Sequence, residues 1–93
     1  MIKMVIPKFR NDDEYNTFKN CADDRDKLND NLVEYETQTA RLADTMSANG
    51  TIVYREYINT ADMIRWLKSK NLPNIGPNRA KYYVEIALAF TLN

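Results

Sequence analysis

The stretch Leu72-Pro73-Asn74-Ile75-Gly76-Pro77-Asn78-Arg79-Ala80 separates two strongly helical patterns near the end of the chain. Pro73 cannot continue the helix before it, and Pro77 suits the first position of the helix after it. The stretch therefore predicts a short, stiff turn that aims a helix N-terminus outward. Such a terminus carries unpaired N–H groups and a partial positive charge, so it suits an anion such as a phosphate.

The segments on either side of this turn carry apolar residues at helical spacing. Upstream, Asn59 or Thr60 caps a helix over 61–70. Its apolar face consists of Met63, Ile64, Trp66 and Leu67. Downstream, the last helix carries two apolar rows: Ala80, Tyr83, Val84, Ala87 and Leu88, and then Tyr82, Ile86 and Phe90. A helix that is apolar almost all round lies in the core or is shared with another subunit, and we expect part of each.

The N-terminal half contains a long segment, 11–49, without proline or glycine. Asn11-Asp12-Asp13-Glu14 is a typical helix start, and Asn49-Gly50 is a typical stop. Steps of three and four residues join Phe18, Cys21, Arg25, Leu28, Leu32, Tyr35, Thr39, Leu42 and Met46. This seam predicts one long amphipathic helix over about 13 to 48, in which Cys21 is buried.

Two shorter segments favour strands. Residues 2–6 alternate loosely before Pro7, and residues 51–58 are rich in β-branched and aromatic side chains. The two segments can pair, although the long helix between them leaves this open. The chain of 93 residues thus predicts a single small domain over 1–93. Its fold class is α+β and mainly helical, with a long amphipathic N-terminal helix, short strand-like segments and a C-terminal helix-turn-helix pair.

The turn resembles the hairpin of helix-hairpin-helix DNA-binding motifs. Their usual form is an apolar residue, Pro-Gly-Ile-Gly, often another proline, and an alanine four positions after the second glycine. The matching residues here are Pro73, Ile75, Gly76, Pro77 and Ala80, with Asn74 in place of the first glycine. The resemblance covers 61–90 and implies a phosphate held without sequence readout, near Gly76, Asn78 and Arg79. Lys81 or Lys70 would assist.

Two other interpretations of the same turn stay open. In a helix-turn-helix protein, the helix over 77–91 would read base edges through exposed Asn78, Arg79, Lys81 and Tyr82. Alternatively, an ordinary turn between two packed helices needs Pro, Asn and Gly for steric reasons alone. The formal charge of zero also argues against a dedicated nucleic-acid binder.

An acidic series supports a different class of function. Asp23, Asp26, Asp30 and Glu34 recur at spacings that place carboxylates on one face of a helix. Such a stripe, or the apolar last helix, would suit a small protein–protein interaction factor. One example is a phage or mobile-element inhibitor that blocks a host defence enzyme. A solvated helix face gives the same pattern, and interleaved cations interrupt it.

The residue types give little basis for catalysis. The chain has no histidine, so it lacks the usual general base and the commonest metal ligand. Cys21 is its only cysteine, which excludes an internal disulfide. We therefore expect a non-catalytic nucleic-acid-binding or regulatory module that contacts phosphates through the 72–81 turn. The alternative is a protein-interaction factor that uses the acidic helix over 13–48 or the apolar last helix. In either case we expect no cofactor and no metal, and a location in the cytoplasm and away from membranes. A homodimer built on the long helix or on the last helix is expected.

Overall fold

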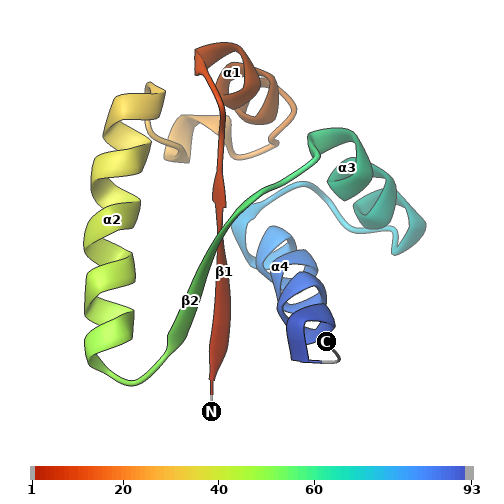
Figure 1. The fold of residues 1–93 in the computed structure, drawn as a ribbon. Coiled ribbons are helices and arrows are strands. Elements are labelled where there is room, and N and C mark those ends of the chain that lie inside the picture. Colours follow the sequence, from red (N-terminus) through yellow and green to blue (C-terminus); the bar gives the residue numbers. More distant parts are fainter. Residues whose placement is uncertain (1, 92–93) are drawn as a thin grey trace.

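The computed structural model describes residues 2–91. The elements in chain order are β1 (Lys3–Lys8), α1 (Asp12–Asn20), a 3₁₀ turn (Arg25–Lys27), α2 (Leu32–Ala48), β2 (Ile52–Tyr57), α3 (Thr60–Ser69) and α4 (Gly76–Thr91). The fold is mainly helical α+β, as the sequence predicts. Figure 1 shows the two strands between α2 on one side and α4 on the other, with α1 and α3 at the upper end.

The two strand-like segments do pair, and they pair in parallel. The register runs from Lys3 opposite Ile52 to Lys8 opposite Tyr57, and the Ile52 N–H donates to the Ile2 carbonyl over 2.9 Å. In a parallel ladder, alternate residues of one strand bond to its neighbour, so Pro7 has its nitrogen on the side away from β2. The strand therefore continues through Pro7 rather than stopping there.

The single helix predicted over 13 to 48 is wrong. The chain leaves α1 after Asn20, forms the 3₁₀ turn and re-enters a helix at Leu32. The side chain of Asn31 accepts the Glu34 N–H over 2.9 Å, which makes Asn31 the N-cap of a new helix. Residues 21–31 are also rich in Asp and Asn, whose short polar side chains compete with helical hydrogen bonds. Cys21 consequently lies just after α1 and is exposed, not buried.

An aromatic core fills the space between α1, α3 and the end of β1. Its fully packed members are Phe9, Tyr15, Phe18, Met63 and Leu67. The Phe9 ring lies 5.0 to 5.3 Å from the rings of Phe18, Tyr15 and Tyr35. The Tyr35 hydroxyl donates to the Pro7 carbonyl over 2.5 Å, so α2 is tied to β1 by a polar contact at the edge of this core.

The helix-turn-helix pair is present where the sequence predicts it. The chain leaves α3 through a Schellman motif: the Leu72 N–H donates to the Leu67 carbonyl over 2.9 Å, and the Asn71 N–H to the Lys68 carbonyl over 3.0 Å. Asn71 takes the left-handed conformation that this motif requires, with φ of 57°. Within the described range 2–91, no helix is long and apolar enough to cross a membrane.

Candidate functional site

Arg79, predicted to face a phosphate, is turned into the protein. Only 4% of the residue is exposed. Its Nη1 donates to Asp24 Oδ1 over 2.8 Å and its Nη2 to Asp24 Oδ2 over 3.0 Å, which is a two-pronged ion pair. Nη1 also lies 3.0 Å from both the carbonyl and the Oδ1 of Asn74. The guanidinium is therefore enclosed by acceptors from its own chain.

The carboxylate of Asp24 sits at the N-terminus of α4. Its Oδ2 accepts the Gly76 N–H over 2.9 Å, in addition to the bonds from Arg79. These hydrogen bonds, led by those from Arg79, hold the pKa of Asp24 below its usual range even though partial burial opposes the shift. Asp24 thus takes the position that the helix-hairpin-helix resemblance assigns to a phosphate.

Asn74, which replaces the first glycine of that motif, is a hydrogen-bonding residue. Its N–H donates to Asp23 Oδ2 over 2.8 Å, and its Nδ2 donates to the Cys21 carbonyl over 2.9 Å. Its own carbonyl accepts the Asp23 N–H over 2.9 Å. We call Asp23, Asp24, Asn74, Gly76 and Arg79 the turn clamp, because together they fasten the α3–α4 turn to the segment after α1.

The other predicted phosphate contacts divide between the inside and the outside of the protein. Asn78 is buried, and its Nδ2 donates to the Pro73 carbonyl over 3.0 Å, which stiffens the turn. Lys70 and Lys81 are exposed. The Lys70 ammonium lies 5.8 Å from the centre of the Trp66 ring. The predicted residues therefore do not converge on one open surface.

The acidic stripe predicted on one helix face does not form, because the helix that would carry it is broken. Asp23 belongs to the turn clamp, and Asp26 lies in the 3₁₀ turn. Asp30 precedes α2, where its N–H donates to Glu34 Oε2 over 3.3 Å and its carboxylate lies 3.7 Å from the Lys19 ammonium. Glu34 is in the first turn of α2. The four carboxylates thus do not share one helix face, because three of them lie in the 21–31 connection and Glu34 lies in α2.

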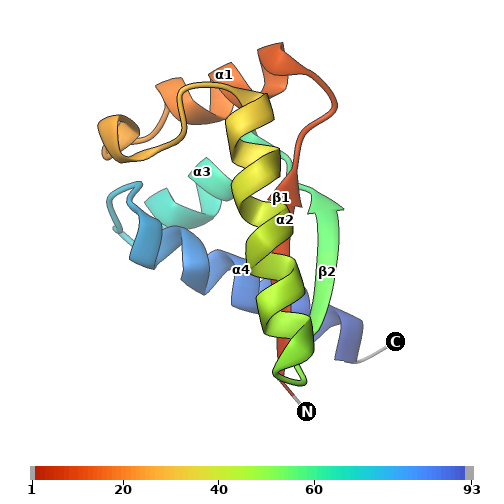
Figure 2. The same ribbon diagram turned by 90° about the vertical axis from the view of Figure 1, so that its left-hand side faces the viewer.

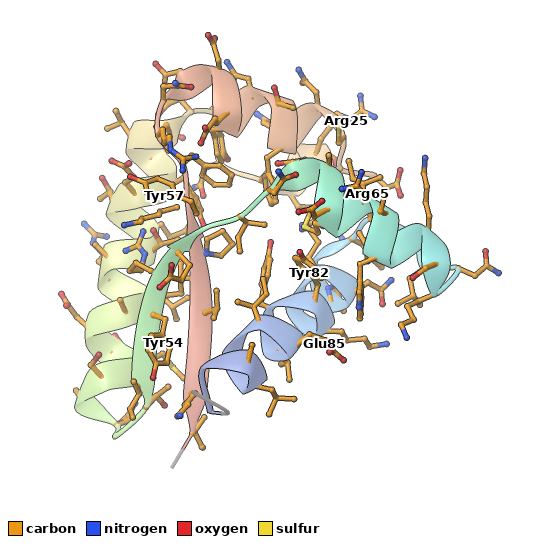
Figure 3. All side chains as sticks on the ribbon, turned by 45° about the vertical axis from the view of Figure 1, so that its right-hand side comes forward. Arg25, Tyr54, Tyr57, Arg65, Tyr82 and Glu85 are labelled. Atoms are coloured by element: carbon orange, nitrogen blue, oxygen red, sulfur yellow. The ribbon has the colours of Figure 1, made fainter. Side chains whose placement is uncertain are left out.

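The solvent side of α4 carries apolar residues. Val84 is 55% exposed and Leu88 is 56% exposed, while Ala87 between them is buried. We define the outer face of α4 as the exposed residues Pro77, Ala80, Lys81, Val84, Glu85 and Leu88. Figure 3 shows Glu85 on the side of α4 turned away from the strands. The inner side contacts α3, where the Trp66 and Tyr82 rings are 5.5 Å apart.

A hollow that sequence reasoning missed lies where both strands end. It has a volume of about 580 Å³ and is lined by the β1–α1 and β2–α3 connections, by α1, by the start of α3 and by the end of β2. Its residues include Arg10, Glu14 and Tyr57. The Arg10 guanidinium lies 4.1 Å from the centre of the Tyr57 ring and pairs with Glu14 at 3.2 Å. Binding crevices commonly form at the carboxyl ends of parallel strands. A prediction that the two strand segments pair in parallel would therefore have indicated this hollow.

Comparisons with known proteins give no indication of the function, so it has to be inferred from the surfaces described above. Protein-family models, curated proteins and solved structures all gave no match to this chain. The helix-hairpin-helix resemblance therefore stays a prediction. In the part of the chain that the structure describes, no group of three or more carboxylate or thiol side chains could hold a metal ion.

Proposed function

We propose that this protein is a non-catalytic protein-interaction factor that binds its target through the outer face of α4. The observation that carries the proposal is the exposure of Val84 and Leu88, each more than half accessible to solvent. Residues four apart lie side by side on a helix, so the two side chains offer one continuous apolar surface. Burying such surface against a partner contributes roughly 25 cal/mol per Å².

The charged residues along one side of this apolar surface support a protein partner. Lys81 and Glu85 are both exposed on the outer face of α4, one turn apart and of opposite sign. An apolar centre with a polar rim is the usual composition of a protein–protein interface. A nucleic-acid partner would favour a surface of uniformly positive charge instead.

The turn clamp gives a second reason to favour a protein target. A phosphate at the N-terminus of α4 would have to displace the Asp24 carboxylate from both Gly76 and Arg79. That exchange would lose a two-pronged ion pair and would bring a second anion towards Asp24. The phosphate hypothesis therefore requires the clamp to open, whereas the outer face of α4 is already accessible.

The proposal is tested by capturing partners from an extract of the source cells. The doubly substituted Val84→Asp/Leu88→Asp protein should lose its specific partner, with retention reduced roughly tenfold or more. The matched control is Val33→Asp/Leu42→Asp, which places the same charges on the exposed apolar residues of α2. This control should retain the partner. Equal capture by all three proteins would exclude the outer face of α4 as the binding surface.

A parallel experiment distinguishes the nucleic-acid hypothesis. The protein is titrated with labelled single- and double-stranded DNA and RNA at two salt concentrations. The test variant is Lys70→Glu/Lys81→Glu, because both lysines are exposed, whereas a substitution of Arg79 would break the buried clamp. We expect no salt-sensitive binding. Binding that weakens steeply with salt and is lost in the lysine variant would contradict the proposal.

A further inference from the structure

The sheet has only two strands, and one edge of it is open. The Ile52 N–H bonds to β1, so the register directs the backbone groups of Ile52, Tyr54 and Glu56 towards β1. The backbone groups of Val53 and Arg55 therefore point outward. Figure 2 shows β2 on the outer side of β1, with α2 in front of the sheet and the C-terminal end of α4 behind the lower part of β2. No other strand among the described residues pairs with it.

This edge lacks most of the features by which proteins normally block strand pairing. Those features are very short strands, bulges, proline, a covering element and charged side chains, and of these β2 has only the charged residues Arg55 and Glu56. Strand β2 is a regular six-residue strand, Ile-Val-Tyr-Arg-Glu-Tyr, without proline or glycine. The Arg55 side chain is directed to α2, where its Nη2 donates to Thr39 Oγ1 over 3.0 Å, so its charge is held away from the open edge. Parallel sheets also seldom consist of so few strands.

We propose that β2 pairs antiparallel with β2 of a second copy of this chain, so that two small sheets join into one of four strands. A two-fold axis perpendicular to the sheet relates the copies. Residues opposite each other in an antiparallel pair share a face of the sheet. In β2 the odd-numbered residues lie on one face of the sheet and the even-numbered residues on the other. The condition therefore excludes every register in which an odd-numbered residue lies opposite an even-numbered one.

Charge then selects between the two registers that pair most of the strand. Centring the axis on Arg55 would place Arg55 opposite its own copy, and like charges directly opposite are destabilising. Centring it on Tyr54 pairs two tyrosines at the axis and places Val53 opposite Arg55 of the copy. Val53 and Arg55 are the residues whose backbone groups point outward, so each such pair exchanges two backbone hydrogen bonds. The sequence of β2 is thus complementary to itself in this register.

The inference is independent of the proposed function, because it concerns a different surface. The outer face of α4 belongs to a helix that packs on β1, and the substitutions at Val84 and Leu88 leave the backbone of β2 unchanged. The proposed strand-paired dimer also differs from the homodimer that the sequence predicts, because the predicted homodimer is built on the long helix or on the last helix. Loss of partner capture and loss of self-association can therefore be observed separately.

Amide hydrogen exchange of the unmodified protein provides the first test. The Tyr54 and Glu56 amides bond to β1 and should be protected at every protein concentration. The Val53 and Arg55 amides should exchange roughly tenfold or more slowly when concentration is raised and sedimentation shows a dimer. A monomer at millimolar concentration, or a dimer in which Val53 and Arg55 still exchange fast, would overturn the inference.

Cross-linking tests the register with a matched pair of variants. In a Cys21→Ser background, Tyr54→Cys should form an intermolecular disulfide under mild oxidation. Directly opposed residues in a non-hydrogen-bonded pair have Cα atoms about 4.5 Å apart, which a disulfide can span. Val53→Cys should not cross-link, because the two copies of residue 53 are offset along the strands. Efficient cross-linking through residue 53 instead of residue 54 would refute this register.

Discussion

At the scale of single residues, the ion pair between Asp24 and Arg79 determines how the α3–α4 turn is held. We expect Asp24→Asn to lower the free energy of unfolding by about 3 kcal/mol, because the guanidinium stays buried without its counter-charge. The substitution keeps the size of the side chain and one acceptor for the Gly76 N–H. Urea denaturation of the two proteins measures the difference directly.

The control for this prediction is the same substitution in an exposed ion pair. Asp62 pairs with Arg65 one turn along α3, and both side chains are at least half exposed. Asp62→Asn should cost less than about 1 kcal/mol, because water already screens the pair. If both variants lose the same free energy of unfolding, burial does not increase the contribution of the Asp24–Arg79 pair to stability.

The same carboxylate predicts how stability depends on pH. Hydrogen bonds from Arg79 lower the pKa of Asp24 in the folded protein below its value in the unfolded chain. The stabilisation is therefore complete above about pH 4 and is lost as the pH falls through the folded pKa. We expect the urea midpoint to fall more steeply in acid for the native protein than for Asp24→Asn. Parallel pH curves would show that another group controls acid unfolding.

At the scale of secondary-structure elements, Asn31 determines where α2 begins. We expect Asn31→Ala to lower the free energy of unfolding by about 1 kcal/mol, because the Glu34 N–H loses its acceptor. The control is Asn16→Ala, at an exposed position inside α1 where alanine is the better helix former. That change should be neutral or slightly stabilising in the same thermal and urea measurements, and a greater loss than at Asn31 would contradict the cap.

The elements differ in how well the sequence predicts them, and the reasons are local. Turn residues around Pro73 and Pro77 mark the α3–α4 turn, and the β-branched run of 51–58 marks β2, because both signals lie within the segment itself. The break between α1 and α2 contains no proline or glycine that would predict it. The sequence signal for the break is a second N-cap residue, Asn31. The regular spacing of apolar residues through the segment obscures this signal, because it predicts one continuous helix.

The contacts of the candidate site could not be predicted from local pattern at all. Asp24 and Arg79 are 55 positions apart, so nothing near Arg79 reveals that its partner is a carboxylate of the same chain. Of the residues predicted to hold a phosphate, Gly76 and Arg79 bind a carboxylate of the same chain. Which anion they bind depends on tertiary structure, because the break after α1 brings Asp24 to the N-terminus of α4.

At the scale of the whole molecule, two sets of side-chain and turn contacts join the N-terminal and C-terminal halves, in addition to the parallel pairing of β1 with β2. The turn clamp connects the segment after α1 to the α3–α4 turn, and the aromatic core packs Phe9 and Phe18 against Met63 and Leu67. Neither half therefore buries its apolar surface or satisfies its buried polar groups alone. This arrangement favours unfolding in one cooperative step, as is usual for domains of this size.

Cooperative unfolding is testable, because the chain contains a single tryptophan. Trp66 is on α3 beside Tyr82 and reports on the C-terminal half, whereas far-UV circular dichroism reports on all the helices. We expect the two signals to change at the same urea concentration and to shift together in Asp24→Asn, because breaking the clamp weakens both halves at once. A Trp66 transition at lower urea than the helical transition would show that α3 and α4 detach first, and would limit the role of the clamp to the C-terminal half.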